Sequence, residues 1–105
     1  MAKFEEMIGT WTFHANDDSE DFRSEYCVSG SEENPIVTAF DRYDGEEYVV
    51  SKCHWNEGAL HFETLMKSTG RKGLNRFEMN DSGQLSFEFT FTEIVTLKRK
   101  GLSIV

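Results

Sequence analysis

The stretch GTWTF at residues 9–13 decides the fold class, because it predicts a β-strand with two unlike faces. Side chains alternate across a strand, so Trp11 and Phe13 point to one face and the two threonines point to the other. The preceding residues, FEEMI at 4–8, allow a short amphipathic helical turn. Two large aromatic side chains on one face predict that this strand closes one end of an apolar core.

The rest of the chain repeats this period of two. Turn-forming residues separate segments that alternate between apolar and polar side chains, which predicts strands at 9–15, 21–29, 36–43, 46–55, 59–66, 72–79, 84–91 and 93–100. Short connections require antiparallel neighbours, and closure of the sheet removes exposed strand edges. We therefore predict one all-β domain over residues 1–105. It is an antiparallel up-and-down meander of about eight strands, closed into a small barrel, with a short N-terminal helical turn.

Both ends of the chain resemble the calycin group, which includes the lipocalins, the fatty-acid-binding proteins and the avidins. In that group a helical turn plugs one end of the barrel, a Gly-x-Trp begins the first strand, and a basic residue of the last strand packs over the Trp. Here Gly9-Thr10-Trp11 and Lys98-Arg99-Lys100 match these features. The resemblance implies a lipocalin-like barrel in which Trp11 and Arg99 provide the closure. The chain lacks the helical lid and the Arg-x-Tyr clamp of the fatty-acid-binding proteins, so ordinary fatty-acid binding is not expected.

Composition limits the partners and the compartment. The net charge is −8, and 15 of the 19 acidic side chains precede residue 66. An acidic surface repels phosphate backbones, so we expect no nucleic-acid partner. No apolar run approaches the length that crosses a bilayer, so we expect no membrane partner and a cytoplasmic protein. Cys27 and Cys53 are then predicted to be two buried, reduced thiols.

The predicted interior is the first candidate for a binding site. The side chains expected to line it are Phe13, Tyr26, Phe40, Phe62, Arg76, Phe87 and Phe89. Aromatic walls with a few polar groups favour a small, partly apolar ligand. The alternative is that these large side chains fill the interior. The acidic loops at 16–21, 29–35 and 44–47 would then serve an inhibitor or adaptor that engages a basic protein partner.

Motifs for catalysis are missing from the sequence. There is neither a nucleophile elbow nor a phosphate loop, so an enzyme is less favoured than either binding function. A hairpin with its turn at Glu57-Gly58 would place His54 opposite His61, next to Cys53. A metal site and a simple cross-strand surface pair are the two alternatives there. Because three or four converging ligands are not evident, we predict no metal, no cofactor and no catalytic residue.

Overall fold

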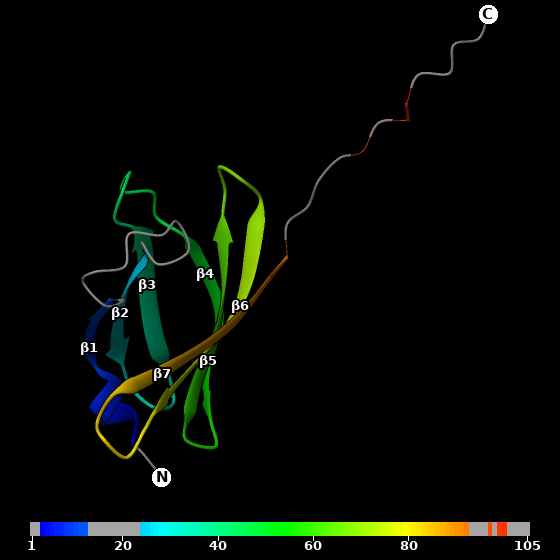
Figure 1. Ribbon diagram of the computed structural model, residues 1–105. Coiled ribbons are helices and arrows are strands. Elements are labelled where there is room, and N and C mark those ends of the chain that lie inside the picture. Colours follow the sequence, from blue (N-terminus) through cyan, green and yellow to red (C-terminus); the bar gives the residue numbers. More distant parts are fainter. Residues whose placement is uncertain (1–2, 13–23, 93–96, 98, 101–105) are drawn as a thin grey trace, which may run out of the picture.

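The computed structural model describes residues 3–12, 24–92, 97, 99 and 100. These residues form an all-β arrangement of two antiparallel sheets with one 3-10 turn, η1 (Phe4–Met7) (Figure 1). The first sheet has the order β1 (Gly9–Thr12), β2 (Ser24–Gly30), β3 (Pro35–Asp41). The second has the order β4 (Val49–Asn56), β5 (Ala59–Met66), β6 (Arg71–Met79), β7 (Leu85–Thr92). Within each sheet every strand pairs with its neighbours in the chain, as in a meander, whereas β3 and β4 belong to different sheets.

The strand positions follow the predicted period of two. Each of the first seven predicted strands overlaps an observed one, and the fifth has the predicted bounds, Ala59–Met66. The hairpin that leads into it turns at Glu57 and Gly58, whose φ angles of 51° and 77° both lie in the left-handed region. Two consecutive positive φ angles are the requirement of a two-residue type I′ turn. The predicted eighth strand, 93–100, falls largely outside the described residues.

The prediction of a closed eight-stranded barrel is wrong. Among the described residues, the two sheets join on one side, where Phe40 bridges to Glu47 and the Tyr48 amide donates to the Ala39 carbonyl at 2.9 Å. On the other side, within the described part of the chain, β1 pairs with β2 alone and β7 with β6 alone. Closure would require the chain to reverse after β7. Residues 85–100 contain no Gly, Pro, Asn or Asp, the residue types that most favour a tight turn.

The turn η1 seals the space between the sheets at one end. Residues three apart in a 3-10 helix lie on the same side, so Phe4 and Met7 both point inward. They are 1% and 0% exposed. The Trp11 indole Nε1 donates a hydrogen bond to the Met7 carbonyl at 2.8 Å, which ties β1 to this turn.

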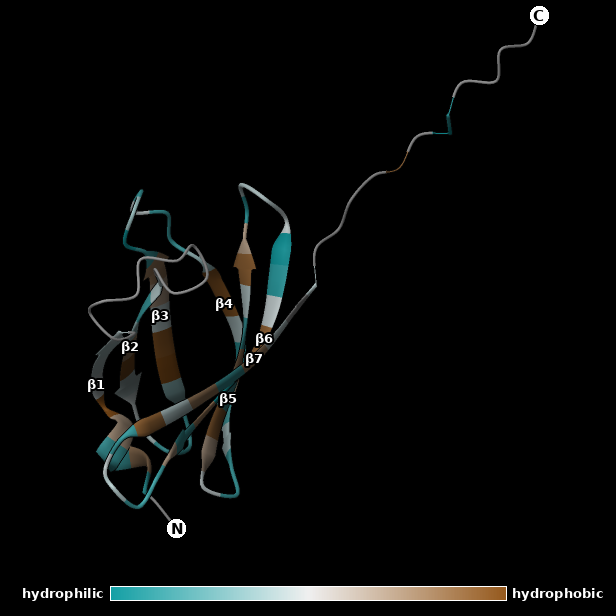
Figure 2. Ribbon diagram, in the orientation of Figure 1, coloured by the Kyte–Doolittle hydropathy of each residue, from teal (hydrophilic) through white to brown (hydrophobic). Residues whose placement is uncertain are grey.

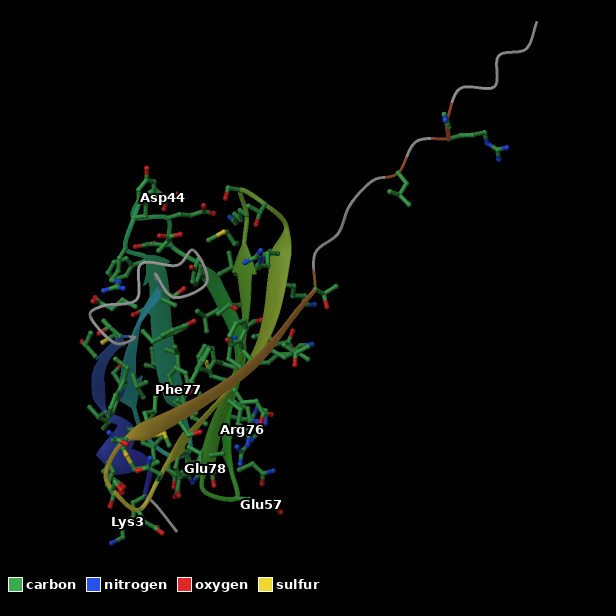
Figure 3. The ribbon with its side chains drawn as sticks, viewed as in Figure 1. Lys3, Asp44, Glu57, Arg76, Phe77 and Glu78 are labelled. Carbon is green, nitrogen blue, oxygen red and sulfur yellow. The ribbon has the colours of Figure 1, made fainter. Side chains whose placement is uncertain are left out.

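Aromatic rings from three strands fill the centre of the core. Tyr26, Phe62 and Phe77 meet edge to face, with ring centroids 5.1 to 5.9 Å apart. This is the preferred geometry for aromatic pairs. Figure 3 shows Phe77 on the side of β6 that faces the first sheet and Arg76 on the opposite side. In Figure 2 most of β3 is apolar, whereas the first residues of β6 are hydrophilic.

Candidate functional site

A cleft of about 630 Å³ opens on the side where the two sheets do not meet. There the start of β7 lies near η1 and β1 (Figure 1). Its apolar lining consists of Trp11, Tyr26, Phe77, Leu85 and Phe87. Its polar lining consists of Thr12, Asn80, Gln84 and Ser86, with Gly83 between them. The cleft is therefore bounded by β1, β2 and the β6–β7 hairpin.

Local hydrogen bonds hold the β6–β7 turn that forms one wall of the cleft. The Asn80 side-chain oxygen accepts from the backbone amides of Ser82 and Gln84, both at 2.9 Å. Such a turn is a common use of asparagine, because its side chain mimics a backbone acceptor. Gly83 has a φ of 78°, which glycine adopts without strain. The turn thereby fixes Gln84 at the entrance.

Aromatic contacts position the inner wall. The Phe87 ring centroid lies 5.5 Å from that of Tyr26 and 5.1 Å from that of Phe77. Burial raises the pKa of the Tyr26 phenol to about 12, with a smaller contribution from Tyr48, while a hydrogen bond from Ser24 acts in the opposite direction. At neutral pH the phenol is protonated. None of the described lining residues carries a charge, so the cleft favours an uncharged ligand.

The structure brings together some of the side chains that the sequence placed in the interior. Tyr26 and Phe87 line the cleft, and Phe89 lies beside Phe87 with ring centroids 5.2 Å apart. Phe89 is 36% exposed. Phe62 belongs to the filled core and is 2% exposed.

Other predicted lining residues lie elsewhere. Phe40 is on the outer face of β3, because its neighbours Ala39 and Asp41 are the buried ones. Arg76 is on the outer face of β6, where it forms an ion pair with Glu78 at 2.8 Å. Neither side chain is part of the cleft lining.

The residues assigned to barrel closure occupy different surroundings. Trp11 is half-buried between the cleft and η1, and Arg99 is exposed. Phe13 lies outside the described residues, as do residues 16–21 of the first acidic loop. Two of the polar residues that line the cleft, Asn80 and Gln84, flank the β6–β7 turn and were not predicted as site residues. Their only sequence signal was the turn between them.

A second cluster lies on the outer face of the four-stranded sheet. His54 and His61 are directly opposite, as the turn predicted, and their rings stack with centroids 4.8 Å apart and planes 9° apart. Burial is the main cause that lowers the pKa of His61, and His54 and Arg76 lower it further. Cys53 packs against the core instead of joining the pair. The described residues hold no group of three or more His, Cys, Asp and Glu side chains suited to a metal.

Both cysteines are free, as the sequence predicted. Cys53 is half-buried, and burial raises the pKa of its thiol. Cys27 is exposed, so the expectation of two buried thiols is wrong for this residue. Among the described residues, no helix has the length and apolar character needed to cross a bilayer.

Comparison with known proteins gives no family model, no curated protein and no solved structure that matches this chain. The resemblance to the calycin group therefore stays a prediction based on residues at the two ends of the sequence.

Proposed function

We propose that this protein binds a small, uncharged, partly apolar molecule in the cleft between β1 and the β6–β7 hairpin. The observation that carries the proposal is the cleft itself, with aromatic walls and a rim of uncharged polar groups. Its volume of about 630 Å³ matches the size of small-molecule sites. Such sites typically combine apolar walls with a few polar groups that orient the ligand.

The proposed ligand lies beside the core and not at its centre. Phe62 and Phe77 fill the centre, with 2% and 1% exposure. The rings of Trp11, Tyr26 and Phe87 line the cleft at the open side. They favour a ligand with a ring or an unsaturated chain, because aromatic surfaces pack well against one another.

Hydrogen bonding supports the choice of an uncharged ligand. The Trp11 Nε1 is already bonded to Met7, so its ring and not its N–H is offered to the cleft. The side chains of Gln84 and Ser86 supply both donors and acceptors at the rim. A charged ligand would lose its hydration here without an opposite charge from the described lining, which is costly.

The alternative of an acidic interaction surface receives less support. Glu32 and Glu33 lie in the connection between β2 and β3, whereas Asp44, Glu46 and Glu47 lie after β3. A seven-residue strand separates these two groups, which places them about 20 Å apart at opposite ends. Figure 3 shows Asp44 at one end of the molecule and Lys3, near the N-terminus, at the other end. The two loops do not form one continuous acidic patch.

The test uses two fluorescent probes of similar size, neutral Nile red and anionic anilinonaphthalene sulfonate. Trp55→Phe leaves Trp11 as the only tryptophan, so quenching of its emission reports occupancy of the cleft. We expect Nile red to bind in a 1:1 ratio with micromolar affinity, about −8 kcal/mol. The anionic probe should bind more weakly, because the described lining holds no basic side chain.

A matched pair of substitutions locates the probe. Phe87→Ala removes a cleft wall and should weaken Nile red binding about tenfold, a loss of about 1.4 kcal/mol. Leu74→Ala is the control, because Leu74 is 56% exposed on the outer face of β6. If Nile red does not bind, or binds equally well to Phe87→Ala, the small-ligand proposal fails. A salt-dependent association with a basic protein would then favour the interaction surface.

A further inference from the structure

A histidine pair on the outer face of the second sheet lies apart from the cleft. His54 of β4 and His61 of β5 are cross-strand partners, and their rings stack 4.8 Å apart between centroids. His54 is exposed and His61 is half-buried. Solvent and small ions therefore reach the pair from the side of the sheet opposite the aromatic core.

A β-bulge immediately before His54 orients its ring. The register between β4 and β5 shifts between Ser51 and His54, and Lys52 within this shift has a φ of 55°. The left-handed region is unfavourable for lysine, and such residues cluster at functional sites. The bulge directs the Lys52 carbonyl towards the His54 ring, where it accepts a hydrogen bond from Nδ1 at 3.0 Å.

This hydrogen bond fixes the tautomer of His54. A carbonyl only accepts, so Nδ1 must carry the proton, and the neutral ring keeps a lone pair on Nε2. Histidines that bind metals typically donate their second ring nitrogen to such a carbonyl or carboxylate, which orients the ring and increases its basicity.

Charged side chains of both signs lie on the same outer face as the pair. On the same outer face, the Lys52 amine pairs with the Glu63 carboxylate at 3.2 Å, and the Arg76 guanidinium pairs with Glu78 at 2.8 Å. Lys72 also reaches Glu63, at 3.6 Å. On β7, Glu88 lies opposite Arg76. The outer face therefore carries the carboxylates of Glu63 and Glu78, each engaged with a basic side chain, as well as the basic groups.

We propose that His54 and His61 form a two-histidine site for a divalent first-row transition-metal ion, with water in the remaining coordination positions. Imidazole nitrogen suits zinc, copper and nickel. Metal–nitrogen bonds of about 2.0–2.1 Å let one ion join ring nitrogens up to about 4 Å apart. Because the stacked rings are nearly parallel, their in-plane lone pairs do not converge, and binding requires the two side chains to rotate until both Nε2 atoms face one ion. With two protein ligands, the site is an exchangeable surface site and not a closed structural centre.

Titration of the full, tag-free chain with Ni²⁺ tests this site by calorimetry. Ni²⁺ is chosen because Cu²⁺ oxidises thiols and both cysteines are free. We expect one ion per chain. His54→Ala and His61→Ala should each weaken binding by about tenfold or more, the size of loss seen at perturbed metal sites. Selective broadening of the His54 and His61 ring signals in NMR spectra should accompany binding.

Two controls exclude other ligands. His14→Ala removes the remaining histidine, and Cys27→Ser removes the exposed thiol. Neither should change the affinity. If His61→Ala lowers the unfolding midpoint, His61→Phe replaces it, because phenylalanine keeps ring stacking without a coordinating nitrogen. The proposal is overturned if no saturation occurs below about 1 mM, if either histidine variant binds like the native protein, or if a control variant loses as much affinity.

Discussion

The Trp11 indole Nε1 donates a hydrogen bond to the Met7 carbonyl at 2.8 Å, and this bond joins the first strand to the turn that seals the core. Met7 is fully buried, so its carbonyl has little access to water as a substitute donor. The resemblance to the calycin group predicts Trp11, with Arg99, as a closing residue. The structure gives it a definite partner on the turn, the Met7 carbonyl.

Trp11→Phe should lower the free energy of unfolding by about 1–2 kcal/mol, because a buried carbonyl loses its donor. Trp55→Phe is the matched control. Trp55 is also half-buried and stacks edge to face on Phe4 with centroids 5.6 Å apart, so phenylalanine keeps that contact. Urea unfolding of both variants measures the difference. Equal destabilisation by the two substitutions would show that the Met7 hydrogen bond contributes nothing specific.

Gly73→Ala should destabilise the protein by about 1–3 kcal/mol through overpacking. An added Cβ would lie 2.8 Å from the Thr64 Oγ1, which also accepts a hydrogen bond from the buried Asn75 amide at 3.1 Å. The hydroxyl is therefore not free to turn away without breaking that bond. Thr64→Ala removes the side chain that the new Cβ would meet. The double variant Gly73→Ala/Thr64→Ala should therefore lose about 1 kcal/mol less unfolding free energy than the two single variants lose together. Strict additivity in urea unfolding would contradict the predicted clash.

Thiol labelling should proceed in two phases. Cys27 is exposed, whereas Cys53 is half-buried and its thiol has a raised pKa, chiefly through burial. Because the thiolate is the reactive species, Cys53 should react more slowly with Ellman's reagent at pH 8. Cys27→Ser should remove the fast phase and Cys53→Ser the slow one. If Cys53→Ser removed the fast phase instead, Cys53 and the bulged part of β4 would lie in a different position in the fold.

Local sequence patterns predicted the strands well because each depends on nearby residues. The bounds of β5 follow from apolar alternation and from the Glu57-Gly58 turn, which fixes the register of the hairpin. The same turn predicted that His54 and His61 would pair. Closure of the barrel could not be predicted in this way. It depends on pairing between the first and last strands, which are far apart in sequence.

The candidate site was predictable in part. Alternation on β7 placed Phe87 inward, and Tyr26 followed from the alternation on β2. Phe40 and Arg76 were assigned to the wrong face, because a shift of one residue in register exchanges the two faces of a strand. The bulge at Lys52 had no sequence signal, since lysine is not typical of the left-handed region. Asn80 and Gln84 join the cleft through tertiary position and not through a motif.

Stability should fall in alkaline solution because of Tyr26. Its folded-state pKa is raised to about 12 by burial, above the value of 10.0 for an exposed tyrosine. Between these pH values the unfolded chain has lost the phenolic proton while the folded chain retains it, so the free energy of unfolding decreases as the pH rises. The full loss is about 3 kcal/mol by pH 12, and the contribution is fully present below pH 10. Urea unfolding from pH 8 to 11.5 should show this slope.

Tyr26→Phe separates this effect from titration of the other tyrosines and the lysines. The variant keeps the ring that contacts Phe77 at 5.2 Å but has no phenolic proton, so its alkaline slope should be shallower by about 1.4 kcal/mol per pH unit between pH 10 and 12. At pH 7 it should differ little from the native protein, apart from the loss of the Ser24 contact. If the free energy of unfolding fell equally steeply with pH in both proteins above pH 10, Tyr26 would be hydrated in the folded state. The inner wall of the cleft would then be more open to water than the 7% exposure of Tyr26 indicates.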